Sequence, residues 1–324
     1  MNDKKFKVSI IIVNFKTLDF IESCINSIEK YCNDFNYEII VANNDDEHQH
    51  FSNFKKKYLS VKCIQNDGNW GFSNGCNLGA SIASGEYFLF LNPDTKIIDG
   101  QAISGMVNHM DANKLTGACS CSILNSNGEE KLLEWNNPWY FIKWIKFLGQ
   151  KFRKNNELNT VNSHILNPPL ISGAVFMINS DDFRILGGWP QNDYWMYSED
   201  RHMCYQITTR LKKEITLLRN YKIFHFWGAS SNKSSINQRI EMIISRHNFI
   251  NLCTKNPERS ILLTIYILKN IIVPFLKVFT YSLILNKKNL IKHFQLLKGV
   301  LVYYYQSLKR KTFRSIRLEI SSKI

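Results

Sequence analysis

Asp94 stands at the end of a strand-like segment, where a carboxylate could bind a metal ion. It follows the apolar run of residues 87–90 within the polar turn of residues 91–95. Open α/β sheets bind ligands at the carboxyl ends of their strands, and Pro93 restricts the direction in which this turn leaves the strand. Hard divalent cations prefer oxygen ligands. We therefore predict that Asp94 binds a metal ion, the alternative being an ordinary Asn-Pro-Asp turn.

Glu199 and Asp200 are adjacent carboxylates that follow a dense aromatic patch at residues 194–197. Aromatic surroundings exclude water and raise carboxylate pKa values. Ser198 is expected to cap a helix that carries apolar residues through position 211, and this would place both carboxylates in the positive first turn. Such a setting suits a general base. Helix capping is the alternative reason for acidic residues at these positions.

One histidine and one glycine-rich run are further candidates for ligand contacts. His225 is expected near the end of a strand over residues 221–227, where the alternative is a structural histidine. Glycine or asparagine fills six of the eleven positions in residues 69–79, and glycine lets a backbone approach a ligand or a packed strand closely. The run fits neither a P-loop nor G-x-G-x-x-G. A ligand-binding loop and the entry to a helix therefore both stay open.

Strand-like and helix-like segments alternate in the part of the chain that must position these residues. Such alternation predicts an α/β fold with a parallel sheet. Polar side chains follow the first two strands at Asn14 and at residues 43–46, where such sheets bind ligands. An aromatic stretch over residues 135–147 is expected to be either an acceptor-side flap or a packed excursion. The expected strands cover residues 7–14, 37–42, 61–65, 87–90, 115–123, 170–178 and 221–227, and the expected helices lie near residues 18–28, 51–58 and 99–113.

Composition bounds the class of protein. The length of 324 residues suggests one large domain with an appendage or two domains. Eight cysteines without C-x-x-C spacing or a secretory leader favour a cytosolic protein with reduced thiols. The net charge of +14 is concentrated in residues 251–324, which hold 14 Lys or Arg against two Glu. These charges alternate with many aliphatic and aromatic residues. We therefore expect an anionic membrane surface as partner and no nucleic acid. Pro274, Lys269 and Lys277 make a true membrane span the less favoured alternative.

As a set, the motifs resemble glycosyltransferase family 2, whose members invert the anomeric centre, and within it the rhamnosyltransferase-like branch of bacterial surface polysaccharide synthesis. The resemblance covers about residues 6–230. The segments that carry it are residues 8–14, 69–79, 91–95, 172–174, 187–189, 197–200 and 225–230.

The resemblance implies a GT-A fold, which is a Rossmann-like, mainly parallel central sheet flanked by helices. It divides the chain into residues 1–230, with a nucleotide-binding part to about 125 and an acceptor-binding part after it, and a basic, helical, membrane-associating region over residues 231–324. Asp94 matches the last acidic position of the family's metal motif, with Asn92 in its first place, and His225 matches a histidine of the metal shell. Asp200 matches the catalytic base and Glu199 its neighbour. The implied nucleotide-sugar-binding residues are Val13, Asn14, Asn43, Asp45, Asn69, Gly71, Phe72, Gly75, Asn77, Asn92, Asp94 and Gly173.

The implied reaction is a Mg²⁺- or Mn²⁺-dependent sugar transfer, and the expected donor is dTDP-L-rhamnose. The expected acceptor is a lipid-linked oligosaccharide on the cytoplasmic face of the bacterial cell membrane, as in O-antigen or capsule synthesis, with the enzyme bound peripherally. The alternatives are a UDP-hexose donor or a catalytically silent sugar- or membrane-binding module. Ala42 replaces the family's base-contacting aspartate, so this role is expected to fall to Asn43 or Asp45. The departures at residues 188–190 and at His202 leave the acceptor open.

Overall fold

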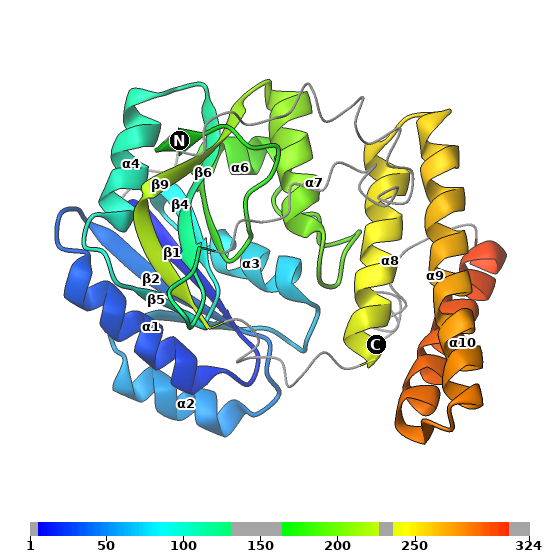
Figure 1. Ribbon diagram of the computed structural model, residues 1–324. Coiled ribbons are helices and arrows are strands. Elements are labelled where there is room, and N and C mark those ends of the chain that lie inside the picture. Colours follow the sequence, from blue (N-terminus) through cyan, green and yellow to red (C-terminus); the bar gives the residue numbers. More distant parts are fainter. Residues whose placement is uncertain (1–5, 131–163, 227–235, 311–324) are drawn as a thin grey trace. The chain divides into compact units, whose positions relative to one another are not determined.

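The computed structural model describes residues 6–130, 164–226 and 236–310, which form two compact units (Figure 1). The described residues of the first unit are 6–130, 164–195 and 199–226. Those of the second are 196–198 and 236–310. The aromatic stretch over residues 135–147 lies outside the described residues.

Strands and helices alternate through the first hundred residues, as the hydrophobic pattern predicts. The first strand carries a continuous apolar run over residues 10–13 because it is buried on both faces, with Val8 and Ile12 on one side and Ile11 and Val13 on the other. Continuous apolar runs of this kind are typical of strands covered by helices on both faces. The elements are β1 (Phe6–Asn14), α1 (Leu18–Tyr31), β2 (Tyr37–Asn43), α2 (His48–Lys57), β3 (Lys62–Gln65), α3 (Phe72–Ser81), β4 (Gly85–Leu91) and β5 (Thr95–Ile97).

Three of the expected boundaries were wrong in the second part of this unit. The strand expected from residue 170 begins only at Val175, because Val175 N donates to the carbonyl of Ser172 in a turn. The strand expected from residue 221 begins earlier, at Glu214, and the helix after Ser198 changes to a π-helix after Gln206. The elements are α4 (Ala102–Ala112), β6 (Thr116–Leu124), β7 (Ile165–Leu166), β8 (Val175–Asn179), α6 (Ser180–Leu186), α7 (Glu199–Gln206), the π-helix η2 (Ile207–Leu211) and β9 (Glu214–His225).

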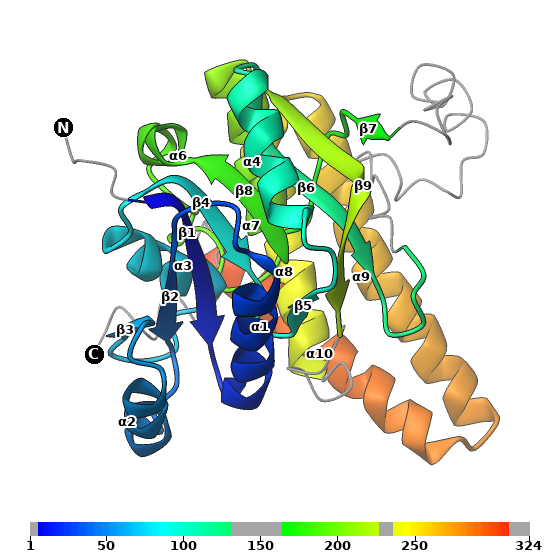
Figure 2. The ribbon, with the colours of Figure 1, turned by 90° about the vertical axis from the view of Figure 1, so that its left-hand side faces the viewer.

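The strands form one sheet in the order β3-β2-β1-β4-β8-β6-β9-β5, with β7 paired to β9 (Figure 2). The expected parallel pairing holds for its first half, where β1 runs parallel to β2 and β4 and β2 runs parallel to β3. β8 then runs antiparallel between β4 and β6, and β9 pairs in parallel with β6 and antiparallel with β5. The sheet is therefore mixed.

Helices cover both faces of this sheet. One hydrophobic cluster joins α1, α2 and α4 to alternate residues of β1, β2 and β4. A second cluster joins α3, α6 and α7 to the opposite face. These three layers confirm the predicted α/β class, and they leave the carboxyl ends of β1, β2 and β4 as the edge on which polar residues gather.

The described part of the second unit is mainly helical. It comprises α8 (Ile236–Cys253), α9 (Glu258–Leu283) and α10 (Lys287–Arg310), packed around residues such as Ile244, Val300 and Tyr303. In length and composition α9 would suffice to cross a membrane, and little of its apolar segment is buried.

A buried carboxylate ties the amino-terminal ends of the first strands together. Glu38 on β2 is 5 % exposed, and it accepts hydrogen bonds from Ser9 Oγ of β1 and from Ser84 N at 2.7 Å just before β4. It also pairs with Lys62 of β3. Burial alone would raise the pKa of Glu38, but these hydrogen bonds outweigh it and hold the pKa below its usual value.

We predict that Glu38→Gln lowers the free energy of unfolding at neutral pH by about 1–3 kcal/mol. Because the folded state lowers the pKa of Glu38, its contribution is present above the unfolded pKa and is lost as pH falls through the folded value. The difference from wild type in urea unfolding should therefore shrink between neutral pH and about pH 3. The control is Glu29→Gln, at an exposed residue on α1. The prediction would be contradicted if the difference in free energy of unfolding between wild type and Glu38→Gln were the same at every pH.

Candidate active site

Asp94 and His225 are brought together by strand pairing. β5 and β9 run antiparallel with Thr95 opposite His225, so the residue before β5 lies beside the end of β9. Both side chains are buried, at 2 % and 4 % exposed, and Asp94 Oδ1 lies 2.9 Å from His225 Nε2. Phe226 N also donates to the carbonyl of Asp94 at 2.9 Å. The two residues predicted to bind metal are therefore direct neighbours.

This pair fits a divalent cation by its chemistry. A carboxylate oxygen and an imidazole nitrogen lie next to one another, and both are atom types that bind divalent cations. Asn92 Nδ2 lies 3.4 Å from the same imidazole nitrogen. Within the part of the chain that the structure describes, His, Cys, Asp and Glu side chains form no group of three that could hold a metal. At this site the protein would thus supply two metal ligands, Asp94 and His225. Oxygen atoms of a bound nucleotide sugar and of water would supply the remaining ligands.

Asp200 lies at the start of α7 and is partly exposed. Its Oδ2 accepts from Gly173 N at 3.3 Å, and its Oδ1 accepts from Arg201 N at 2.8 Å. A Cβ on Gly173 would come 3.5 Å from the Cβ of Asp200 and close to the ring of Phe72. The carboxylate is therefore oriented by backbone N–H groups but still reachable by an acceptor hydroxyl.

Glu199 is buried, unlike its neighbour. Burial raises the pKa of the Cys76 thiol on α3 well above its usual value, and the charge of Glu199 raises it further. The glutamate thus lies toward α3. Ser198 has φ 65°, in the left-handed region. The expectation of an ordinary serine cap was therefore wrong, because a capping residue adopts an extended backbone.

The loop of residues 172–174 connects the two halves of the candidate site. Asn92 N, in the turn that carries Asp94, donates to the carbonyl of Ala174 at 2.9 Å. The preceding residue, Gly173, donates to Asp200. The turn that follows β4 and carries Asp94, and Asp200 at the start of α7, therefore both hydrogen-bond the same short segment of backbone.

The glycine-rich run packs tightly within the first unit. Gly71 has φ 92°, and a side chain there would overlap the carbonyl oxygen of Trp195. Phe72 N donates to that carbonyl at 3.0 Å, and Gly75 packs against Val13. Close approach to neighbouring backbone and side chains thus accounts for these glycines. Their contact with a nucleotide sugar stays a prediction.

Asn77 forms a two-way hydrogen-bonded clamp on the backbone of Trp189. Trp189 N donates to Asn77 Oδ1 at 2.8 Å, and Asn77 Nδ2 donates to the carbonyl of Trp189 at 2.9 Å. Gly188 has φ 80° and no room for a Cβ beside this amide. The clamp holds the buried Trp189 ring against Phe72 and Phe176. Asn77 therefore joins α3 to the loop after α6.

Amide side chains follow the carboxyl ends of the first strands and bind one another. Asn14 donates to Asn43, and Asn43 Nδ2 donates to Gln65 Oε1 at 2.8 Å and to the carbonyl of Asp45 at 3.0 Å. Asn69 accepts from Gly71 N at 3.2 Å through its side chain. This network holds the predicted nucleotide-binding residues in fixed positions.

The network extends to Asn44, which belongs to the polar cluster of residues 43–46, and to Asn66, which the sequence interpretation missed. Asn66 Nδ2 donates to Asn44 Oδ1 at 2.9 Å and to Asn74 Oδ1 at 2.6 Å, and Asn44 donates to the carbonyl of Gly71. Each of the two residues comes directly after a strand. A position directly after a strand, the signal that identified Asn14, could also have identified Asn66.

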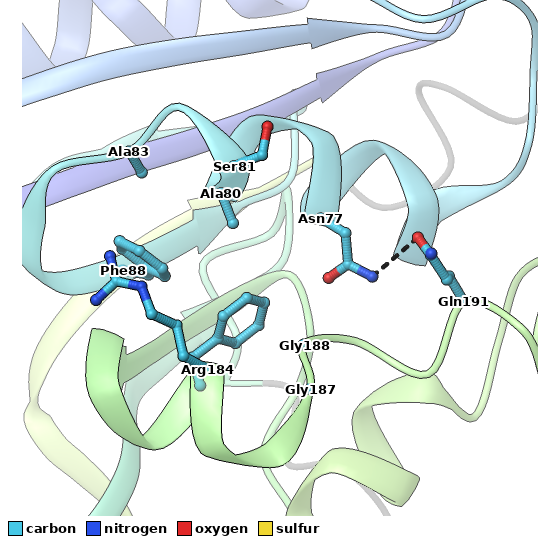
Figure 3. A pocket seen from close by; sticks show the side chains of 10 residues that line it. Asn77, Ala80, Ser81, Ala83, Phe88, Arg184, Gly187, Gly188 and Gln191 are labelled. Atoms are coloured by element: carbon cyan, nitrogen blue, oxygen red, sulfur yellow. Dashed lines mark hydrogen bonds between the residues drawn. The ribbon is translucent and has the colours of Figure 1, made fainter.

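An open pocket of about 380 Å³ lies between α3 and α6 (Figure 3). Figure 3 shows Arg184 beside Phe88, and Asn77 hydrogen-bonded to Gln191. Its lining includes none of Asp94, Glu199, Asp200 and His225. The pocket is thus separate from the carboxylate edge of the sheet.

The first unit has the GT-A fold, a central sheet flanked by helices with polar residues at the carboxyl ends of its first strands. Residues 9–168 of the chain match the family Glycosyl transferase family 2. No curated protein sequence matches the chain.

Solved structures with the same fold share little sequence with the chain. GalNAc-T7 with UDP, GalNAc and Mn²⁺ is 13% identical with a TM-score of 0.55, over 80% of this chain and 53% of that one. This chain therefore spans about half the length of GalNAc-T7. S. aureus TarS 1-349 with UDP is 13% identical with a TM-score of 0.51, over 82% of this chain and 71% of that one. The mannosyltransferase PcManGT from Pyrobaculum calidifontis with GDP-Man and Mn²⁺ is 13% identical with a TM-score of 0.54, over 93% of this chain and 88% of that one.

We predict that Asn77→Ala lowers the free energy of unfolding by about 2–4 kcal/mol, because two backbone groups of Trp189 lose their partners. Urea unfolding measures this loss, and Ser81→Ala at the exposed end of the same helix is the control. If Asn77→Ala kept its stability and bound nucleotide sugars more weakly, Asn77 would instead be assigned to donor binding.

We predict that His225→Ala raises the Mn²⁺ concentration for half-maximal thermal stabilisation about tenfold or more, measured in the presence of dTDP or UDP. The reason is the loss of the imidazole ligand opposite Asp94. His109→Ala is the control, because His109 is a partly buried histidine that bonds Thr116 Oγ1 at 3.1 Å rather than a carboxylate. Equal midpoints in the two variants would remove His225 from the metal site.

Proposed function

We propose that the protein is an inverting, metal-dependent glycosyltransferase that uses dTDP-L-rhamnose to extend a lipid-linked oligosaccharide. The observation that carries the proposal is that the turn carrying Asp94, through Asn92 N, and the carboxylate of Asp200 both hydrogen-bond residues 173–174. A metal-binding carboxylate and an accessible base at one edge of the sheet are what a single displacement requires.

Asp94 and His225 would hold the cation, which when bound supplies positive charge to the nucleoside diphosphate leaving group. Asp200 takes the proton of the acceptor hydroxyl, whose oxygen forms a bond to the anomeric carbon. The bond from that carbon to the diphosphate oxygen breaks, and its electron pair leaves with the nucleoside diphosphate. Gly173 N and Arg201 N orient the Asp200 carboxylate for this role. Attack from the face opposite the leaving group inverts the anomeric centre.

The donor assignment rests on the set of motifs shared with the rhamnosyltransferase-like branch. Ala42 takes the place of a base-contacting aspartate, and the neighbouring Asn43 and Asp45 are buried in the amide network. A UDP-hexose is the second candidate, since GalNAc-T7 and TarS of the same fold bind UDP. The acceptor and a cytoplasmic, peripheral membrane location are supported by the basic, apolar composition of residues 251–324.

Asp200→Asn is expected to lower turnover about 10²–10⁴-fold while leaving donor affinity unchanged, because only proton transfer to the base is lost. Release of dTDP from dTDP-L-rhamnose, with cell membranes as the acceptor source, measures turnover. Thermal shift measures donor binding. Asp181→Asn, at an exposed carboxylate on α6, is the control. Full turnover in Asp200→Asn would refute the role of base.

The same assay with dTDP-L-rhamnose, UDP-glucose, UDP-GalNAc and GDP-mannose, each with and without Mn²⁺, decides between the donors. Fastest turnover with dTDP-L-rhamnose supports the proposal. Fastest turnover with a UDP sugar supports the second candidate. If no donor were turned over or stabilised the fold, a silent binding module would replace both.

A further inference from the structure

One face of α9 carries large apolar side chains that remain exposed. They recur every three or four residues, so they share one side of the helix over about 22 Å. Leu262, Tyr266 and Pro274 lie on the opposite side and are buried. The members of this apolar stripe are Leu268, Ile272, Phe275, Phe279 and Leu283. A soluble surface seldom presents so continuous an apolar strip without a partner.

The turn between α9 and α10 extends the stripe to the tip of a helical hairpin. Leu283, Ile284 and Leu285 are all exposed there, and Leu285 is 88 % exposed. Lys287 and Lys288 follow at once and are exposed as well. The tip therefore combines side chains that favour hydrocarbon with charges that favour anionic head groups.

The outward face of α10 mixes the same two kinds of side chain. Ile291, Val302 and Tyr305 are exposed on it, and the helical period places Lys298 and Lys309 among them. The buried face of this helix, with Val300 and Tyr303, is apolar. An amphipathic helix whose solvent side carries both lysines and apolar residues is typical of binding in the plane of a membrane.

We propose that α9 and α10 bind the surface of an anionic phospholipid bilayer, with the α9 stripe and the hairpin tip inserted among the acyl chains. The charge of this region favours an anionic bilayer, rather than a second copy of the chain, as the partner of this face. Residues 251–324 carry 14 Lys or Arg and two Glu, so two such regions would repel one another. An anionic bilayer attracts them.

The packing of the two helices favours a hairpin that lies on the membrane over one that spans it. The rings of Tyr281 and His293 stack near the tip at 5.4 Å, and Ile271 packs with Val300 further along. α10 therefore runs antiparallel alongside α9 (Figure 2). If α9 crossed the bilayer, Lys298 would be carried toward its centre, where a charge is costly. In a hairpin that lies flat, the lysine can extend to the head groups.

This inference rests on the proposed membrane location and not on the transfer reaction. Vesicle binding by the full chain needs no sugar donor, so it can fail while transfer persists, and the reverse also holds. We expect the protein to co-sediment with vesicles of equal parts phosphatidylglycerol and phosphatidylcholine, and much less with phosphatidylcholine alone. Added salt should weaken the binding.

Two variants with matched controls test the contacts. Leu285→Ser is expected to weaken partitioning about tenfold, whereas Leu59→Ser, at a residue of the first unit that is 87 % exposed, leaves it unchanged. Lys287→Gln with Lys288→Gln is expected to weaken partitioning about fivefold for each lysine removed. The adjacent exposed pair Lys55 and Lys56 on α2 provides the control Lys55→Gln with Lys56→Gln. Unchanged thermal unfolding of each variant shows that the fold is kept.

Each of three kinds of result would overturn the proposal. One is the absence of an expected difference, namely equal binding to anionic and neutral vesicles or equal effects of Leu285→Ser and Leu59→Ser. Another is a dimer in analytical ultracentrifugation that Leu285→Ser dissociates, which would assign the face to a second copy. The third is retention in cell membranes after alkaline carbonate extraction, which would show that α9 spans the bilayer.

Discussion

The hydrogen bond from Asn92 N to the carbonyl of Ala174 is the contact on which the candidate site depends. It continues the antiparallel pairing of β4 with β8 by one step beyond Leu91 and Val175. The register of β4 and β8 thereby places the turn that carries Asp94 next to the loop of residues 172–174. In that loop, Gly173 N donates to Asp200. No contact between the two carboxylates is needed, since backbone hydrogen bonds carry the alignment. Shifting the register by one residue would send each side chain to the other face of the sheet.

The two carboxylates are prepared for different work by their surroundings. Asp94 is buried, and a buried charge is costly unless it is paired. His225 provides that pairing in the protein alone, at 2.9 Å. Asp200 keeps access to solvent, and within the described residues its carboxylate accepts from the backbone N–H groups of Gly173 and Arg201. A cation at Asp94 and a proton accepted by Asp200 would thus occupy separate positions at the same edge of the sheet. This suits a reaction that stabilises charge on one oxygen while another oxygen loses its proton.

Hydrophobic period predicted most of the strands and helices because burial on both faces leaves a clear pattern in residues such as those of β1. It failed at residues 170–174, where part of an apolar run forms a turn, because apolar composition does not show whether a segment is extended or turns back. The pairing of Asp94 with His225 depends on two strands meeting across 131 positions, which no local spacing reveals. Resemblance to a family supplied that pairing. For the glycines, the sequence left ligand contact and tight packing open, and the contacts of Gly71 and Gly75 in the structure are with neighbouring elements.

The departures from the family pattern act on packing more than on acceptor choice. Trp189 is 1 % exposed and clamped by Asn77, so its ring fills the core under α7 and cannot stack on a sugar. His202 is buried with its ring edge-on to Tyr194, and burial lowers its pKa. A side chain that no acceptor touches cannot select among acceptors. Phe72, whose ring lies close to Gly173, and Trp195, whose Nε1 donates to the carbonyl of Asn69, are partly exposed and are therefore more accessible to a ligand than Trp189.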